Sequence, residues 1–112
     1  MNRLFIKLLF LFFIVSCASE TPTNVNLIEK EKMIKILTQL HLAEAFVNAN
    51  YTYSDSAKYM YKKMEDSILT AQGTNLAIFD SSMSYYQKDV KSMDEIYAAS
   101  IDSLSLMEGI AK

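Results

Sequence analysis

The chain has 112 residues, one cysteine and a formal net charge of −2, and 51% of its residues are hydrophobic. This length suits one small domain. The mild, interspersed charge argues against a nucleic-acid-binding protein and leaves no basic patch for anionic lipid.

The first 16 residues have the organisation of an export signal. Arg3 and Lys7 supply a positive start, and residues 8–15 form an uncharged apolar run. That run is far shorter than the roughly 20 residues that a membrane-spanning helix needs. A charged start followed by a short apolar core predicts a secretory signal peptide at residues 1–16, which is removed from the mature protein.

The signal ends in Ile14-Val15-Ser16-Cys17, which resembles the lipobox of bacterial lipoproteins. The thiol is the group that diacylglycerol can alkylate, and the small residue before it gives a peptidase access to the bond that it cuts. We therefore expect Cys17 to be the lipidated first residue of the mature protein. Apart from this covalent lipid, we expect no cofactor. The alternative is an ordinary secretory signal with a chance cysteine.

Residues 17–26 follow the signal as a short polar segment with the only proline, Pro22. We expect a flexible tether, which spans at most roughly 30 Å. Ala18 follows the cysteine directly, and Glu20 is the only acid nearby. This pattern favours the outer membrane, facing the periplasm, with the inner membrane and the cell surface as alternatives.

Residues 27–112 are expected to form an all-α domain, because apolar residues recur at three-to-four spacing and no proline follows Pro22. The first helix is predicted over residues 27–48. The second begins at Ser54 or Asp55 and ends near residue 72, before a stop at Gly73. The third begins after Thr74 or Asn75 and ends near residue 88.

The fourth helix is predicted to begin at Ser92, where a serine followed three residues later by Glu95 fits a capping box. Its expected inward face comprises Met93, Ile96, Tyr97, Ile101, Leu104 and Met107. The short connections favour antiparallel neighbours. The predicted fold is therefore a compact three- or four-helix bundle, preceded by the lipoprotein signal and its tether.

Three patches carry a family resemblance: residues 31–34 with 40–45, residues 79–86, and Glu95-Ile96-Tyr97 with Ile101 and Leu104. Together with the lipobox, they resemble a family of small Bacteroidota lipoproteins known as domain of unknown function 4296. The resemblance covers about residues 27–106. The turn at residues 88–91 lacks the proline that often follows the tyrosine pair in that family. The resemblance implies a helical, exported, lipidated protein, and it supplies no catalytic residue or substrate.

His41 and Glu44 stand three residues apart on the first predicted helix and can meet on one face. The pair could serve a metal or a general base, or it could be a polar pair packed against another helix. We favour the polar pair, because zinc sites usually draw several His or Cys ligands and no second one is present. No catalytic residue and no metal site are therefore expected.

Seven tyrosines are many for this length, and tyrosine is enriched at interfaces. Tyr51, Tyr53, Tyr85 and Tyr86 are the candidates for a contact surface. The alternative places the tyrosines in the core and at its boundary, bonding between helices. Adjacent Tyr85 and Tyr86 point about 100° apart on a helix, so we expect them to differ in burial.

Three functions are compatible with these features. The favoured one is a non-enzymatic interaction module, held on the membrane by its lipid, that docks an envelope protein. The second is a periplasmic binding or chaperone-like domain for an apolar ligand or an unfolded chain. The third, an enzyme using His41 and Glu44, has the least support in the sequence.

Overall fold

The computed structural model describes residues 26–52 and 54–111. The predicted signal peptide, Cys17, nearly all of the tether and Tyr53 lie outside these ranges. Four helices account for most of the described chain: α2 (Lys30–Asn50), α3 (Asp55–Ala71), α4 (Leu76–Gln87) and α5 (Val90–Ala111). The same residues contain no strand, which confirms the all-α fold.

The helix α2 begins three residues later than predicted, because Ile28 is bonded to another element. The Ile28 N–H donates to Ser82 Oγ at 3.0 Å, and the Tyr86 hydroxyl donates to the Ile28 carbonyl at 2.7 Å. Both partners lie on α4. Ile28 therefore cannot take part in the first turn of α2, whose first backbone bond runs from Met33 N–H to Glu29 C=O.

The turn between α3 and α4 is encoded as predicted. Gly73 has φ +70°, a left-handed conformation that glycine adopts at little cost. Its N–H donates to the Thr70 carbonyl, and the Thr74 N–H donates to the Leu69 carbonyl, which together form a Schellman motif. Asn75 then caps α4, because its side-chain oxygen accepts from the Ile78 N–H at 3.0 Å.

The predicted capping box at Ser92 is wrong, because α5 begins two residues earlier at Val90. Asp89 replaces Ser92 at the cap: the Ser92 hydroxyl donates to Asp89 Oδ2 at 2.6 Å. That bond and the backbone N–H groups of Ser92 and Lys91 lower the pKa of Asp89. Glu95, the expected second member of the box, instead accepts from Lys30 Nζ on α2 at 2.7 Å.

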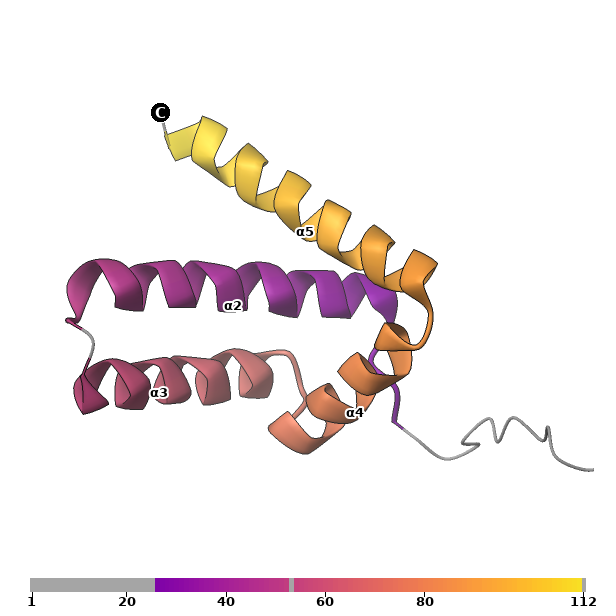
Figure 1. Ribbon diagram of the computed structural model, residues 1–112, viewed down its shortest axis with the longest axis horizontal. Coiled ribbons are helices and arrows are strands. Elements are labelled where there is room, and N and C mark those ends of the chain that lie inside the picture. Colours follow the sequence, from indigo (N-terminus) through magenta and orange to yellow (C-terminus); the bar gives the residue numbers. More distant parts are fainter. Residues whose placement is uncertain (1–25, 53, 112) are drawn as a thin grey trace, which may run out of the picture.

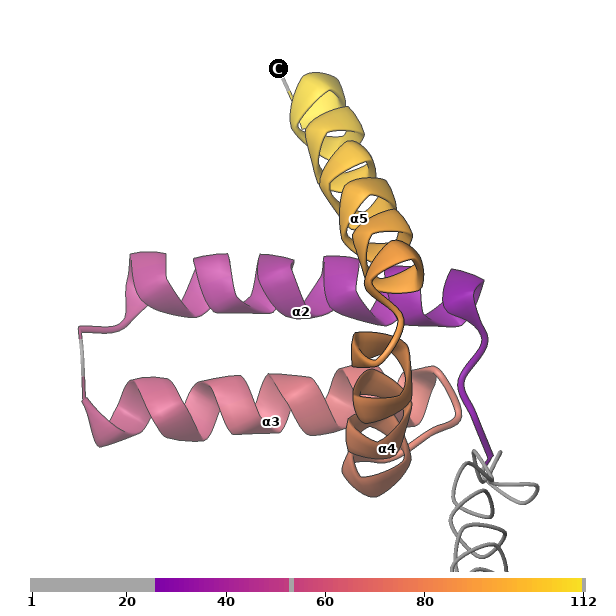
Figure 2. The ribbon, with the colours of Figure 1, turned by 45° about the vertical axis from the view of Figure 1, so that its right-hand side comes forward.

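The helices α2 and α3 lie side by side and antiparallel, and α4 crosses the end where α2 begins (Figure 1). The chain then returns along α5, which starts beside the first turns of α2 and moves away from it toward its own C-terminus (Figure 2). The core draws on all four helices and on Ile28: Met33, Ile36, Leu37, Leu40, Leu69, Phe79, Tyr86, Met93 and Ile96.

The divergence of α5 corrects the predicted inward face of this helix. Met93 and Ile96 are buried as expected. Tyr97, Ile101 and Met107 are instead 40%, 60% and 46% exposed, and Leu104 is only half-buried. The apolar spacing continues along the whole helix, but α2 covers only the first half of it.

Candidate functional site

The second half of α5 presents large apolar side chains that nothing in the described chain covers fully. We call this surface the distal α5 face, and it consists of Ile101, Leu104, Leu106, Met107 and Ile110. Leu106 and Ile110 are 68% and 78% exposed. Exposed apolar side chains are normal singly, but a contiguous group of them marks an interaction site.

A second feature lies at the opposite end of α2 from α4, where α2 and α3 are connected. We call it the hairpin groove. It is open, encloses about 570 Å³, and is lined by Glu44, Val47, Asn48, Tyr51, Thr52, Ser54, Ala57, Lys58 and Tyr61. A volume of this size lies within the range of small-molecule sites.

The wall of the hairpin groove combines aromatic and acidic groups. Tyr61 is half-buried, and its pKa is raised by burial first and then by the negative charges of Glu65 and Glu44. Its phenol therefore stays neutral and can donate a hydrogen bond at ordinary pH. The groove can hold an apolar body against Tyr51 and Tyr61 while its polar edge remains wet.

His41 and Glu44 come together on α2, but in an exposed position. His41 Nδ1 lies 3.8 Å from Glu44 Oε2, which is too long for a hydrogen bond, and the two side chains are 44% and 61% exposed. The expectation that this pair packs against another helix is therefore wrong. Within residues 26–52 and 54–111, no group of three His, Cys, Asp or Glu side chains could hold a metal ion.

The candidate tyrosines do not form one surface. Tyr51 lines the hairpin groove, whereas Tyr85 lies on α4 at the other end of the domain. Tyr85 is 46% exposed but Tyr86 is only 5% exposed, so the assignment of Tyr86 to a contact surface is wrong. Tyr86 is buried because its hydroxyl bonds the Ile28 carbonyl and its ring meets Tyr85 edge to face.

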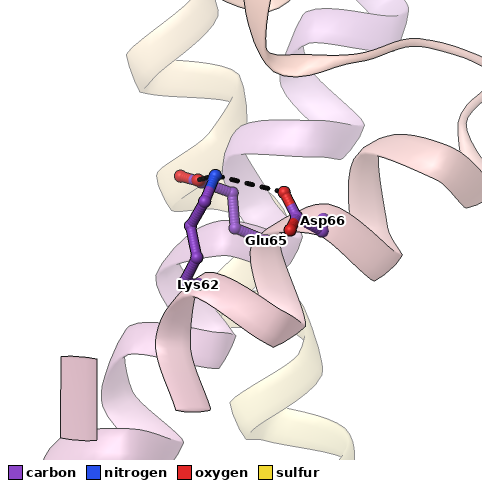
Figure 3. Close-up of polar contacts among 3 residues, drawn as sticks. All are labelled: Lys62, Glu65 and Asp66. Carbon is purple, nitrogen blue, oxygen red and sulfur yellow. Dashed lines mark hydrogen bonds and ion pairs between the residues drawn. The ribbon is translucent and has the colours of Figure 1, made fainter. Parts of the chain in front are cut away.

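The outer side of α3 carries charged side chains that form ion pairs with one another within the helix. Lys62 Nζ lies 3.3 Å from Glu65 Oε1 and 3.2 Å from Asp66 Oδ1, within the same helix (Figure 3). The hydrogen bond to Asp66 is the main cause of the raised pKa of Lys62. Ion pairs of this spacing stabilise the helix slightly. This part of α3 therefore presents charged side chains to the solvent.

Most of the distal α5 face could not be foreseen from the sequence. Ile101, Leu104 and Met107 were predicted to face inward, and no prediction was made for Leu106 or Ile110. One signal was available: the apolar residues after residue 100 occupy more than one stripe of the helix.

The described helices also bear on the relation to a bilayer. None of those within residues 26–52 and 54–111 has both the length and the apolar character needed to cross one.

Comparison with known proteins gives one match. The family model described as Domain of unknown function (DUF4296) matches residues 25–108. No curated protein and no solved structure matches the chain.

Proposed function

This chain belongs to the family described as Domain of unknown function (DUF4296), and from that premise we propose that it is a lipid-anchored, non-enzymatic interaction module of the bacterial cell envelope. The observation that carries the proposal is the distal α5 face. A helix with exposed large apolar side chains is costly in solubility unless another molecule covers it.

The anchoring part of the proposal rests on the sequence around Cys17. The lipobox predicts a lipid on this residue, and each buried methylene group contributes about 0.8 kcal/mol of membrane affinity. Two or three long acyl chains would hold the protein in the outer membrane, facing the periplasm. A protein held in this way needs no apolar surface for membrane attachment, so the distal α5 face remains for a protein partner.

The arrangement of the domain suits this role. The chain enters at Ile28, which α4 holds, and the end of α5 lies away from that entry point (Figure 1). The ten or so residues before Ile28 span at most roughly 35 Å. The tether would therefore place the domain close to the membrane while the distal α5 face points away from the point of attachment.

The anchor is tested by comparing the wild type with Cys17→Ser. We expect the wild-type protein from the envelope to have lost residues 1–16 and to carry acyl mass in intact mass spectrometry. We expect the variant to keep its leader and to lack that mass. A variant found in the envelope at full yield with its leader removed, beside a wild type without acyl mass, would refute the anchor.

The docking role is tested by photo-crosslinking in cells from position 107 of α5. We expect a defined envelope protein to be joined at this position and absent when the crosslinker is placed at position 59, which is exposed on α3. Crosslinking from both positions to the same mixture, or from neither, would count against an interaction module.

The hairpin groove favours a second candidate, a binding or chaperone-like domain for an apolar ligand or an unfolded chain. The supporting observation is the open volume of about 570 Å³ beside Tyr51 and Tyr61. If this is the function, the protein should slow the aggregation of reduced α-lactalbumin, and Tyr51→Ser should abolish the effect. Tyr59→Ser on the outer side of α3 is the matched control. Equal effects of the two variants would exclude the groove as the binding site.

A further inference from the structure

We propose that the distal α5 face binds a lysine-rich amphipathic helix of the partner protein. The inference rests on the proposed docking function and names the chemistry of the partner. It follows from the position of charged residues around the apolar face, which is independent of the observation that the face is exposed.

The shape of the face suits a helix. Its five apolar residues lie within ten residues of α5, a length of roughly 15 Å. This corresponds to about three turns of a second helix laid along the first. Recognition of this kind uses apolar anchors at three-to-four spacing, and Leu104, Met107 and Ile110 already have that spacing on α5.

The charges around the face are of one sign. Residues 92–111 contain the acids Asp94, Glu95, Asp102 and Glu108 and no lysine or arginine. Glu95 is paired with Lys30 of α2. Asp102 stands four residues before Leu106 and borders the apolar face on that side of the helix, whereas Asp94 stands two turns before Ile101, at the end of the face nearest the core.

The neighbouring part of α2 does not supply a compensating base. Residues 36–50 of this helix contain Glu44 and again no lysine or arginine. The lysines of the described helices lie elsewhere, at the start of α2, on α3 and at the junction of α4 and α5. An apolar face with acids along one edge and at one end complements an apolar strip bordered by bases, and this pairing gives both affinity and orientation.

The same charges disfavour the other occupants. Two copies packed through this face would bring their acids together, and like charges across an interface are unfavourable. An anionic lipid surface would meet the same repulsion. A basic amphipathic helix is the occupant that gains from both the apolar residues and the acids.

The test is a titration of two designed peptides against the full-length chain in nanodiscs of neutral phosphatidylcholine. Both fluorescent peptides have 14 residues with leucine at helical spacing, and the remaining positions are lysine in one and glutamate in the other. We expect anisotropy to report binding of the lysine peptide, weakened by added salt, and no binding of the glutamate peptide. Empty nanodiscs measure any binding of the peptides to lipid.

Variants locate the binding. Met107→Ser with Ile110→Ser should weaken the lysine peptide at least about tenfold, and Asp94→Asn with Asp102→Asn should reduce the salt dependence. Tyr59→Ser on α3 should change neither. All these side chains are exposed, so circular dichroism should report an intact helical fold for each variant.

Several outcomes would overturn the proposal: equal binding of the two peptides, no binding of either above the empty nanodiscs, an unchanged affinity in the Met107/Ile110 variant, or crosslinks between α5 helices of two copies. A partner crosslinked in cells from position 107 would then still support the docking role while the charge of its binding segment is wrong. The two proposals therefore fail on different measurements.

Discussion

The two halves of α5 carry similar rows of apolar side chains in opposite surroundings. In the first half, Met93 and Ile96 are 8% and 0% exposed, whereas in the second half Ile101 and Ile110 are 60% and 78% exposed. Once the first half has formed against α2, each further residue adds a hydrogen bond at little cost, so the helix can continue without packing. Apolar spacing therefore identifies the face of a helix that is suited to packing. It does not tell whether another part of the same chain packs against that face.

The largest effect is expected when the same substitution, Ile→Ala, is made in each half of α5. Ile96→Ala should lower the free energy of unfolding by about 2–5 kcal/mol, because it opens a cavity in the core. Ile110→Ala should change it by no more than about 0.5 kcal/mol. Urea denaturation followed by circular dichroism measures both. Similar losses at the two positions would show that the second half of α5 is packed in solution.

A smaller effect is expected at the contact between α4 and Ile28. Tyr86→Phe removes the hydroxyl that donates to the Ile28 carbonyl and leaves that buried acceptor unpaired. We expect a loss of about 1–3 kcal/mol in the free energy of unfolding. Tyr85→Phe is the matched control, because its ring is 46% exposed and should tolerate the change. If the control were equally destabilised, the bond to Ile28 would not be the cause.

The smallest effect concerns the ion pair that joins the first half of α5 to α2. The hydrogen bond from Lys30 lowers the pKa of Glu95 below its ordinary value of 4.5, and the same bond raises the pKa of Lys30 above 10.5. The stabilisation from Glu95 is therefore present above pH 4.5 and is lost as the pH falls through the lowered pKa. The contribution of Lys30 is lost as the pH rises through its raised pKa.

Thermal unfolding between pH 6 and pH 3 measures the acidic side of this dependence. We expect Glu95→Gln to flatten the fall in stability slightly, because exposed ion pairs contribute little. Asp94→Asn, at the preceding position of α5, is the control. Its stability should fall between pH 6 and pH 3 by more than that of Glu95→Gln. A steeper fall in the Glu95→Gln variant would contradict the assignment.

Signals that act within a few residues predicted much of the fold. Gly73 and Asn75 end α3 and cap α4 as expected, because a left-handed glycine and an asparagine cap depend only on their neighbours along the chain. Asp89 and Ser92 could both begin a helix; the earlier residue does so, and its carboxylate accepts from the Ser92 hydroxyl within the first turn.

Features that depend on distant contacts were predicted less well. The start of α2 is fixed by Ser82 and Tyr86, more than fifty residues away along the chain. The separation of Tyr85 from Tyr86 was expected from helix geometry, but the geometry alone could not tell which ring is buried. The hairpin groove and the distal α5 face depend on the angles between helices, and local sequence does not encode these angles directly.

The two bonds from α4 to Ile28 also determine how the domain resists mechanical load. Traction on the residues before Ile28 reaches Ser82 and Tyr86 before it reaches the first turn of α2. The pull is then shared between two helices that are far apart in the sequence, so α2 does not peel away from its end one turn at a time. If the proposed anchor is correct, a force along the predicted tether enters the domain through this buried contact and not through the distant end of α5.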